Sequence, residues 1–213
     1  MIRAVIWDFG GVITTSPFEA FNVYEAERGL PKDFIRTINA TNPLDNAWAK
    51  FESSRVSIDE FDGLFDAEAR ERGHSLPGKD VIALLSGDLR PKMVRALHVL
   101  KEKLRIGCIT NNVKAGEGAG MARDAAKAAS VAEVMALFEV VIQSSKVGIR
   151  KPDPDIYKMA CEALSIEPAE AVYLDDLGIN LKPARALGMT TIKVIDPDEA
   201  LAELEAAVGF PLG

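Results

Sequence analysis

The sequence predicts an α/β protein: a doubly wound parallel sheet with an all-helical segment inserted after the first strand. Three observations favour this fold. Short apolar runs recur along the chain and end on polar residues, which is typical of strands buried on both faces of a parallel sheet. Helical stretches with start and stop signals separate the later runs. The long segment after the first run shows helical periodicity and no convincing strand.

Five runs are predicted to be strands, because each is short, apolar and rich in β-branched residues. In chain order they are Ala4–Trp7, Arg105–Ile109, Glu139–Ile142, Ala171–Leu174 and Thr190–Ile195. The first run ends on a single acid, Asp8, and two glycines follow it directly. Glycine adopts backbone conformations closed to other residues, so Gly11 is expected to let the chain turn sharply toward the next segment.

Residues 16–88 are predicted to form a small helical cap, which leaves residues 1–15 and 89–213 as the α/β core. Aromatic and aliphatic residues recur here at helical spacing, and glycines and prolines interrupt them. We interpret the aromatic residues first as the core of this bundle. Trp48, Lys50 and Glu52 are candidates for substrate contact, although Trp48 is expected in the bundle core and Glu52 on its solvated face.

Three helices are predicted among the later strands. An aspartate followed by proline, an N-cap signal with proline at the first helical position, precedes two of them. Their expected ranges are Ile156–Leu164 after Asp153-Pro154, Leu181–Leu187 before Gly188, and Glu199–Val208 between Asp196-Pro197 and Gly209. The glycine- and alanine-rich stretch Asn111–Ser130 is predicted to be a loop followed by helix. It lacks the Gly-Lys-Ser/Thr ending of a phosphate-binding P-loop.

Composition excludes several classes of protein. The chain has 213 residues, enough for one domain or one core with an insertion, and its net charge is −7. An acidic balance argues against nucleic acid as a partner, and no run approaches the roughly 20 apolar residues of a membrane span. Cys108 and Cys161 lie in apolar patterns and are expected to be buried free thiols, which fits a cytoplasmic location. With only His74 and His98, a multi-histidine metal site is impossible.

Polar residues follow the predicted strands where each strand ends. They are Asp8, Thr110, Asn111, Asp175 and Asp176, with Lys151 and Asn180 a little further along the chain. Ligands of open parallel sheets bind at the carboxyl ends of the strands, so we expect these groups in one crevice. Carboxylates suit Mg²⁺, and a fixed lysine suits phosphoryl transfer. Taken singly, each acid is more readily explained as a turn or helix cap, and Lys151 as a solvated loop lysine.

Four motifs resemble, in the same order, those of the haloacid dehalogenase (HAD) superfamily, and in particular its phosphatases. They are "WDFGGVIT", "CITNN", "SSKVGIRKPDPDIY" and "YLDDLGINLKPARALGMTTI". The last two look most like the phosphatase domain at the N-terminus of soluble epoxide hydrolases and its relatives fused to acyl-CoA dehydrogenases. The resemblance covers about residues 1–15 and 90–196 and implies a Rossmann-like core.

The resemblance also implies a role for each matching residue. Asp8 is expected to be the nucleophile and a Mg²⁺ ligand. Thr110, Asn111 and Lys151 are expected to bind the phosphoryl group, and Lys151 to stabilise the charge that develops there. For the acidic pair the implied roles concern the metal: Asp175 and Asp176 hold Mg²⁺, with Asp176 expected as the direct ligand, and Asn180 supports the site.

One position departs from the family pattern, which has a second aspartate two residues after the nucleophile. That aspartate transfers protons, whereas Gly10 stands there in this chain. The family binds its metal through the backbone carbonyl of this residue, so Gly10 is still expected as a Mg²⁺ ligand. General acid–base catalysis contributes typically about 10²–10⁴-fold, so a slow enzyme is expected, one that favours good leaving groups such as sugar 1-phosphates or acyl phosphates.

These expectations describe a Mg²⁺-dependent phosphatase that hydrolyses a small phosphorylated metabolite through an aspartyl-phosphate on Asp8. The protein is expected to be a monomer or homodimer. Two alternatives stay open. One is a metal-independent 2-haloacid dehalogenase, which the acidic pair Asp175-Asp176 argues against. The other is a catalytically weakened protein that binds phosphate ligands or holds a long-lived aspartyl-phosphate.

Overall fold

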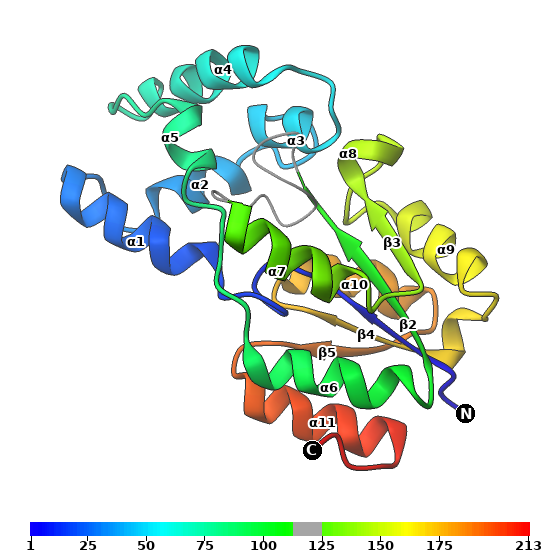
Figure 1. Ribbon diagram of the computed structural model, residues 1–213. Coiled ribbons are helices and arrows are strands. Elements are labelled where there is room, and N and C mark those ends of the chain that lie inside the picture. The colour runs from blue at the N-terminus through cyan, green and yellow to red at the C-terminus, as the bar shows by residue number, and fades with distance from the viewer. Residues whose placement is uncertain (113–124) are drawn as a thin grey trace.

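A five-stranded parallel sheet forms the centre of the computed structural model, which describes residues 1–112 and 125–213 (Figure 1). The strands lie in the order β3-β2-β1-β4-β5, and every neighbouring pair is parallel. Their bounds are β1 Ala4–Trp7, β2 Arg105–Thr110, β3 Val140–Gln143, β4 Ala171–Asp175 and β5 Thr190–Lys193. The predicted doubly wound sheet is confirmed, with the first strand at its centre.

Helices cover both faces of the sheet, so its strands are buried on both sides (Figure 1). Successive side chains of a strand point to opposite faces. On β1, Val5 and Trp7 therefore pack with one set of helices, and Ala4 and Ile6 with the other. The first set is α6 Pro91–Lys101, α7 Ala125–Met135 and α11 Pro197–Val208, and the second is α9 Pro154–Ala163 and α10 Gly178–Ala186.

The predicted cap residues of the later helices have their expected geometry. The Asp153 carboxylate accepts the backbone N–H of Asp155 at 3.0 Å at the start of α9, and Gly209 ends α11 with φ 84°. The bounds of seven elements differ from the prediction by one to three residues. β2 and β4 each end one residue later than predicted, at Thr110 and Asp175, whereas α9 spans Pro154–Ala163 and α11 begins at Pro197. Helix α10 begins three residues earlier, at Gly178, β3 lies one residue later, and β5 ends at Lys193, two residues short of the exposed Ile195.

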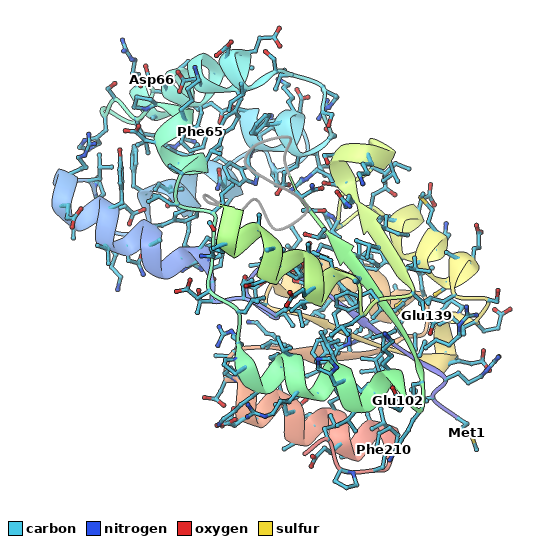
Figure 2. All side chains as sticks on the ribbon, viewed as in Figure 1. Met1, Phe65, Asp66, Glu102, Glu139 and Phe210 are labelled. Carbon is cyan, nitrogen blue, oxygen red and sulfur yellow. The ribbon has the colours of Figure 1, made fainter. Side chains whose placement is uncertain are left out.

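Five helices lie between the first strand and α6, and they form a separate layer over one end of the sheet (Figure 1). They are α1 Pro17–Arg28, α2 Phe34–Ala40, α3 Ala47–Glu52, α4 Ile58–Arg70 and α5 Gly78–Ile82. They share an apolar core that includes Phe61 and Phe65. Figure 2 shows Phe65 at the opposite end of the molecule from Phe210.

The chain enters and leaves this helical layer at adjacent points. Thr14 and Leu89 form an isolated antiparallel bridge, and the Thr15 N–H donates to the Asp88 carbonyl at 2.8 Å. A segment inserted into a core must begin and end at neighbouring points, because the chain has to return to the core where it left. The two adjacent connections meet this requirement. The division into a cap of residues 16–88 and a core of residues 1–15 and 89–213 is consistent with them and stays a prediction.

Two further expectations concern residues outside the site. Cys108 and Cys161 are buried and free, as predicted. The loop predicted at the start of the Asn111–Ser130 stretch falls mainly in residues 113–124, outside the described residues, whereas helix is confirmed from Ala125 onward. No helix in the described ranges is long and apolar enough to cross a membrane.

Candidate active site

The carboxyl ends of three neighbouring strands bring the predicted site residues together. Asp8 follows β1, Thr110 ends β2 and Asp175 ends β4. Because β1 lies between the other two strands, their ends meet at one edge of the sheet. The Asp8 N–H donates to the Leu174 carbonyl at 2.8 Å, which continues the strand pairing up to the predicted nucleophile. All three side chains are buried, so the sheet fixes their positions.

Lys151 joins two of these carboxylates. Its Nζ lies 2.8 Å from Asp8 Oδ1 and 2.8 Å from Asp175 Oδ2, and the residue is only 1% exposed. A buried lysine is stable only when it is paired. Burial lowers the pKa of Lys151, but Asp175 and Asp8 together outweigh this effect and hold the pKa above its ordinary value. The ammonium group therefore stays charged, which excludes the solvated loop lysine considered above.

Asn111 holds the backbone of Lys151. Its Oδ1 accepts the Lys151 N–H at 2.8 Å, and its Nδ2 donates to the Lys151 carbonyl at 3.0 Å. The carboxamide is thus occupied by the protein itself, and its direct effect is to orient the lysine. A contact between Asn111 and phosphate stays a prediction.

The Asp175 carboxylate is surrounded by donors. Besides Lys151, it accepts hydrogen bonds from the Tyr173 hydroxyl, from Asn180 Nδ2 at 3.0 Å and from the Leu177 N–H at 2.8 Å. The last of these contacts is the turn-forming role that the sequence left open for this residue. Asn180 Nδ2 contacts only Asp175 of the acidic pair, and its supporting role at a metal site stays a prediction. Four donors leave Asp175 little capacity to bind anything else.

Asp176 has a different environment. Within residues 1–112 and 125–213, no other residue donates a hydrogen bond to its carboxylate. Burial, followed by the charge of Asp175, raises the pKa of Asp176 to about 6. Gly11 gives this carboxylate its space, because a Cβ at Gly11 would lie 2.3 Å from Asp176 Oδ2, and Gly11 has φ +79°. Both facts make glycine necessary at position 11, for packing as well as for the turn.

The three carboxylates fit a divalent cation. Ligand oxygens of Asp8, Asp175 and Asp176 all lie within 4.8 Å of one another, and one buried lysine is the nearby cation. Burial, then the charges of Asp175 and Asp176, keep the pKa of Asp8 well above its usual value despite Lys151. Crowded carboxylate oxygens are the donors that Mg²⁺ prefers. Asp176, whose carboxylate has no donor from another described residue, suits a direct ligand better than Asp175.

A cavity of about 460 Å³ opens beside the carboxylates, between the sheet edge and the helices of the predicted cap. Asp8, Thr110, Lys151 and Asp176 line its core side, and Gly10 faces it as well. Much of the opposite wall is apolar: Pro17, Phe18, Phe21, Ala40, Pro43, Leu44, Trp48 and Leu85. The predicted role of Gly10 as a carbonyl ligand stays a prediction.

Of the three cap candidates, Trp48 and Glu52 line the cavity. Trp48 also packs against Phe61, with ring centroids 5.6 Å apart, so it belongs to the bundle core and to the cavity wall. The expectation that Glu52 lies on a solvated face is wrong, since it is 6% exposed and accepts from Arg150 Nε at 2.6 Å. Lys50 is not among the described lining residues and pairs with Asp45 at 3.5 Å.

Four polar lining residues were not among the predicted site residues: Thr14, Arg36, Asn39 and Arg150. Arg150 precedes Lys151 directly in the third motif, which was the one available signal for it. Arg36 lies over the Phe18 ring at 4.4 Å, and Asn39 Oδ1 is buried without a hydrogen-bond partner among the described residues. Both come from α2, where no sequence pattern distinguishes them from solvated helix residues.

A family model for haloacid dehalogenase-like hydrolases matches residues 2–188. The chain belongs to this family. The HAD-like chain is 34% identical over 99% of its length to acyl-CoA dehydrogenase family member 10 of Mus musculus, and 32% identical over 99% to bifunctional epoxide hydrolase 2 of Sus scrofa. It spans only 19% and 40% of those two relatives, so it corresponds to one part of each. The resemblance inferred from the motifs is confirmed.

Solved structures confirm the HAD fold. A HAD-family enzyme of Bacteroides thetaiotaomicron, in complex with magnesium and inorganic phosphate, has TM-score 0.58 and 22% identity, covering 91% of this chain and 94% of that one. The L-2-haloacid dehalogenase of Xanthobacter autotrophicus, with chloropropionic acid covalently bound, has TM-score 0.62 and 18% identity, covering 97% and 83%. The same fold therefore occurs in a protein with magnesium and phosphate bound and in a dehalogenase with chloropropionic acid covalently bound.

Proposed function

We propose that this HAD hydrolase is a Mg²⁺-dependent phosphatase that acts on a small phosphorylated metabolite through an aspartyl-phosphate on Asp8. One observation carries the proposal: three carboxylates lie close together beside the cavity, and two of them pair with the buried Lys151. Halide displacement needs no metal ion, whereas phosphoryl transfer needs the cation that the acidic pair Asp175-Asp176 would help to hold. The magnesium- and phosphate-bound neighbour supports the same choice.

The environment of Asp8 suggests which oxygen attacks phosphorus. Asp8 Oδ1 interacts with Lys151 Nζ at 2.8 Å and accepts the Phe9 N–H at 2.6 Å. Oδ2 accepts no hydrogen bond among the described residues and is the oxygen left for the reaction. The new bond joins Oδ2 to phosphorus as the bond from phosphorus to the leaving oxygen breaks. Water then attacks the phosphorus of the aspartyl-phosphate, which releases inorganic phosphate and restores Asp8.

The other residues position and neutralise the phosphoryl group. Lys151 supplies a fixed positive charge, and the buried Thr110 offers a hydroxyl from the cavity wall. Asp8, Asp176 and the Gly10 carbonyl would hold Mg²⁺, and Asp175 would keep Lys151 and Asn180 in place beside it. When bound, Mg²⁺ would neutralise phosphoryl oxygens during transfer.

The test is release of inorganic phosphate from a panel of sugar, nucleotide and acyl phosphates, with Mg²⁺ and with a chelator. We expect turnover that the chelator abolishes and that Asp8→Asn reduces to background. Asp155→Asn, an exposed carboxylate on α9, is the matched control and should keep full activity. Metal-independent release of chloride from a 2-chloro acid would instead establish a dehalogenase. A stable phosphoprotein labelled at Asp8, with no turnover, would indicate the weakened phosphate-binding protein.

A further inference from the structure

We propose that the preferred substrates are phosphoric anhydrides, meaning acyl phosphates or organic diphosphates, rather than phosphate esters of simple alcohols. The inference rests on the proposed phosphatase function and names its substrate class. It follows from the supply of protons in the cavity, because the described lining residues include no group able to protonate a leaving oxygen.

The described residues that line the cavity include few titratable groups. They are Asp8, Glu52 and Asp176 as acids, and Arg36, Arg150 and Lys151 as bases. No histidine, cysteine or tyrosine occurs among them. Histidine and carboxylic acids are the usual proton donors of enzymes, so the question reduces to whether one of these three acids is free to carry a proton.

Each of the three acids is committed to another role. Asp8 is the attacking group, and Asp176 is the proposed metal ligand. Glu52 Oε2 lies 2.5 Å from Arg150 Nη2 and accepts a hydrogen bond from Arg150 Nε at 2.6 Å. It also accepts a hydrogen bond from Asn111 Nδ2 at 3.4 Å. A carboxylate held in this way by a charged guanidinium acts as a hydrogen-bond acceptor and is committed to that contact.

The three bases do not provide a proton either. Arginine does not give up its proton in proteins. Lys151 stands between Asp8 and Asp175, so losing its proton would leave two buried carboxylates without a counter-charge. Gly10, next to the nucleophile on the cavity wall, has no side chain, and a Cβ built there meets nothing within 4 Å. Position 10, where the family pattern has an aspartate, therefore has open space and carries no proton donor.

The missing proton decides which leaving groups can depart. When the bond from phosphorus breaks, its electron pair stays on the leaving oxygen. A simple alcohol would leave as an alkoxide, a strong base that needs a proton during the step. A carboxylate or a phosphate leaves as an anion that is stable at neutral pH and takes no proton. General acid catalysis contributes about 10²–10⁴-fold where it operates. The described lining residues supply no such acid, so esters of alcohols gain no such factor from them, whereas anhydrides do not need it.

The test is kcat/KM for a series of phosphates that share one phosphoryl group and differ in the acidity of the leaving group. Hexyl phosphate, a set of substituted phenyl phosphates, acetyl phosphate and geranyl diphosphate form the series, all with Mg²⁺. We expect kcat/KM to fall steadily as the leaving group becomes more basic, with hexyl phosphate about 10²-fold or more below the most acidic phenol ester. The faster of acetyl phosphate and geranyl diphosphate identifies the kind of anhydride.

Two isosteric variants at position 10 separate proton transfer from bulk. The open space at Gly10 accommodates either side chain, and its φ lies outside the left-handed region. Gly10→Asp should exceed Gly10→Asn in kcat/KM for hexyl phosphate by about 10²-fold, whereas the two variants should agree within a few-fold for acetyl phosphate.

Three results would overturn the inference while the phosphatase stands: kcat/KM independent of leaving-group acidity, hexyl phosphate hydrolysed as fast as acetyl phosphate, or Gly10→Asp acting no differently from Gly10→Asn. Absence of Mg²⁺-dependent phosphate release from every compound of the series, including acetyl phosphate, would overturn the phosphatase function itself. The two failures therefore look different in the same set of measurements.

Discussion

The side chain of Asn111 forms hydrogen bonds with both backbone polar groups of Lys151. The carboxamide oxygen accepts the Lys151 N–H at 2.8 Å, and the carboxamide nitrogen donates to the Lys151 carbonyl at 3.0 Å. This paired contact ties the loop before α9 to the end of β2. It fixes the origin of a side chain whose ammonium group reaches two carboxylates at once.

Asn111→Ala should therefore lower kcat by loosening Lys151. Loss of two hydrogen bonds to a buried backbone is expected to cost about 1–3 kcal/mol in the free energy of unfolding. The Mg²⁺ affinity should stay close to that of the wild type, because the variant leaves Asp8, Asp175 and Asp176 in place. Steady-state kinetics, urea unfolding and calorimetric Mg²⁺ titration give the three quantities. A parallel fall in kcat and Mg²⁺ affinity would contradict a role confined to positioning the lysine.

The two neighbouring aspartates should respond in opposite ways to loss of charge. Asp175→Asn removes a charged acceptor from Lys151, Tyr173 and Asn180, and should cost about 3 kcal/mol of unfolding free energy. Asp176→Asn removes a carboxylate that no other described residue hydrogen-bonds, so the metal-free fold should keep or gain stability while Mg²⁺ affinity falls at least about tenfold. Urea unfolding in the presence of a chelator measures the stability of the two variants, and Mg²⁺ titration measures their affinity for the metal. The reverse pattern would make Asp175 the direct ligand.

Alanine substitutions at Gly11 and Gly10 compare the effect of one added methyl group at two nearby positions. Gly11→Ala places its Cβ 2.3 Å from Asp176 Oδ2 at a backbone with φ +79°, whereas Gly10→Ala meets nothing within 4 Å. Gly11→Ala should therefore displace the Asp176 carboxylate, weaken Mg²⁺ binding at least about tenfold and destabilise the fold by about 1 kcal/mol or more. Gly10→Ala should change both quantities little. Equal effects of the two variants on Mg²⁺ affinity would exclude the proposed need for space beside Asp176.

Glu52 and Arg150 should be energetically coupled. Glu52 ends α3, Arg150 lies on the core, and their side chains are mostly buried, at 8% and 20% exposure. A double-mutant cycle with Glu52→Gln and Arg150→Met should give a coupling free energy of about 1–3 kcal/mol in urea unfolding. The exposed pair Arg105–Glu139, 3.0 Å apart, is the control and should give less than about 1 kcal/mol.

The Glu52–Arg150 pair connects the helical layer to the loop that carries Lys151, because Arg150 directly precedes Lys151. Glu52 also accepts a hydrogen bond from Asn111 Nδ2. Glu52→Gln should therefore raise KM and lower kcat, with Mg²⁺ affinity unchanged. A coupling free energy near zero, together with wild-type kinetics, would show that the contact between the two layers is incidental.

Strand ends were the most predictable part of the site. Asp8, Thr110 and Asp175 could be placed together from the sequence because parallel strands expose their carboxyl ends at one edge, whatever the helices do. Residues from the helical layer were less predictable. Glu52 was expected on a solvated face, because nothing in its own helix shows that Arg150, 98 residues later in the chain, buries it. Arg36 and Asn39 were not found at all, since helix periodicity marks the apolar face and says nothing about a cavity.

The sequence by itself determined the sheet, the order of the motifs and the family, because these depend on local patterns of apolar runs and on residues fixed within each motif. Only the tertiary structure decided how the acids differ. Asp175 and Asp176 are adjacent in the chain and chemically identical, yet one is surrounded by four donors and the other faces Gly11 and the cavity. The reason is that hydrogen bonding and burial depend on neighbours from distant segments, which no local pattern specifies.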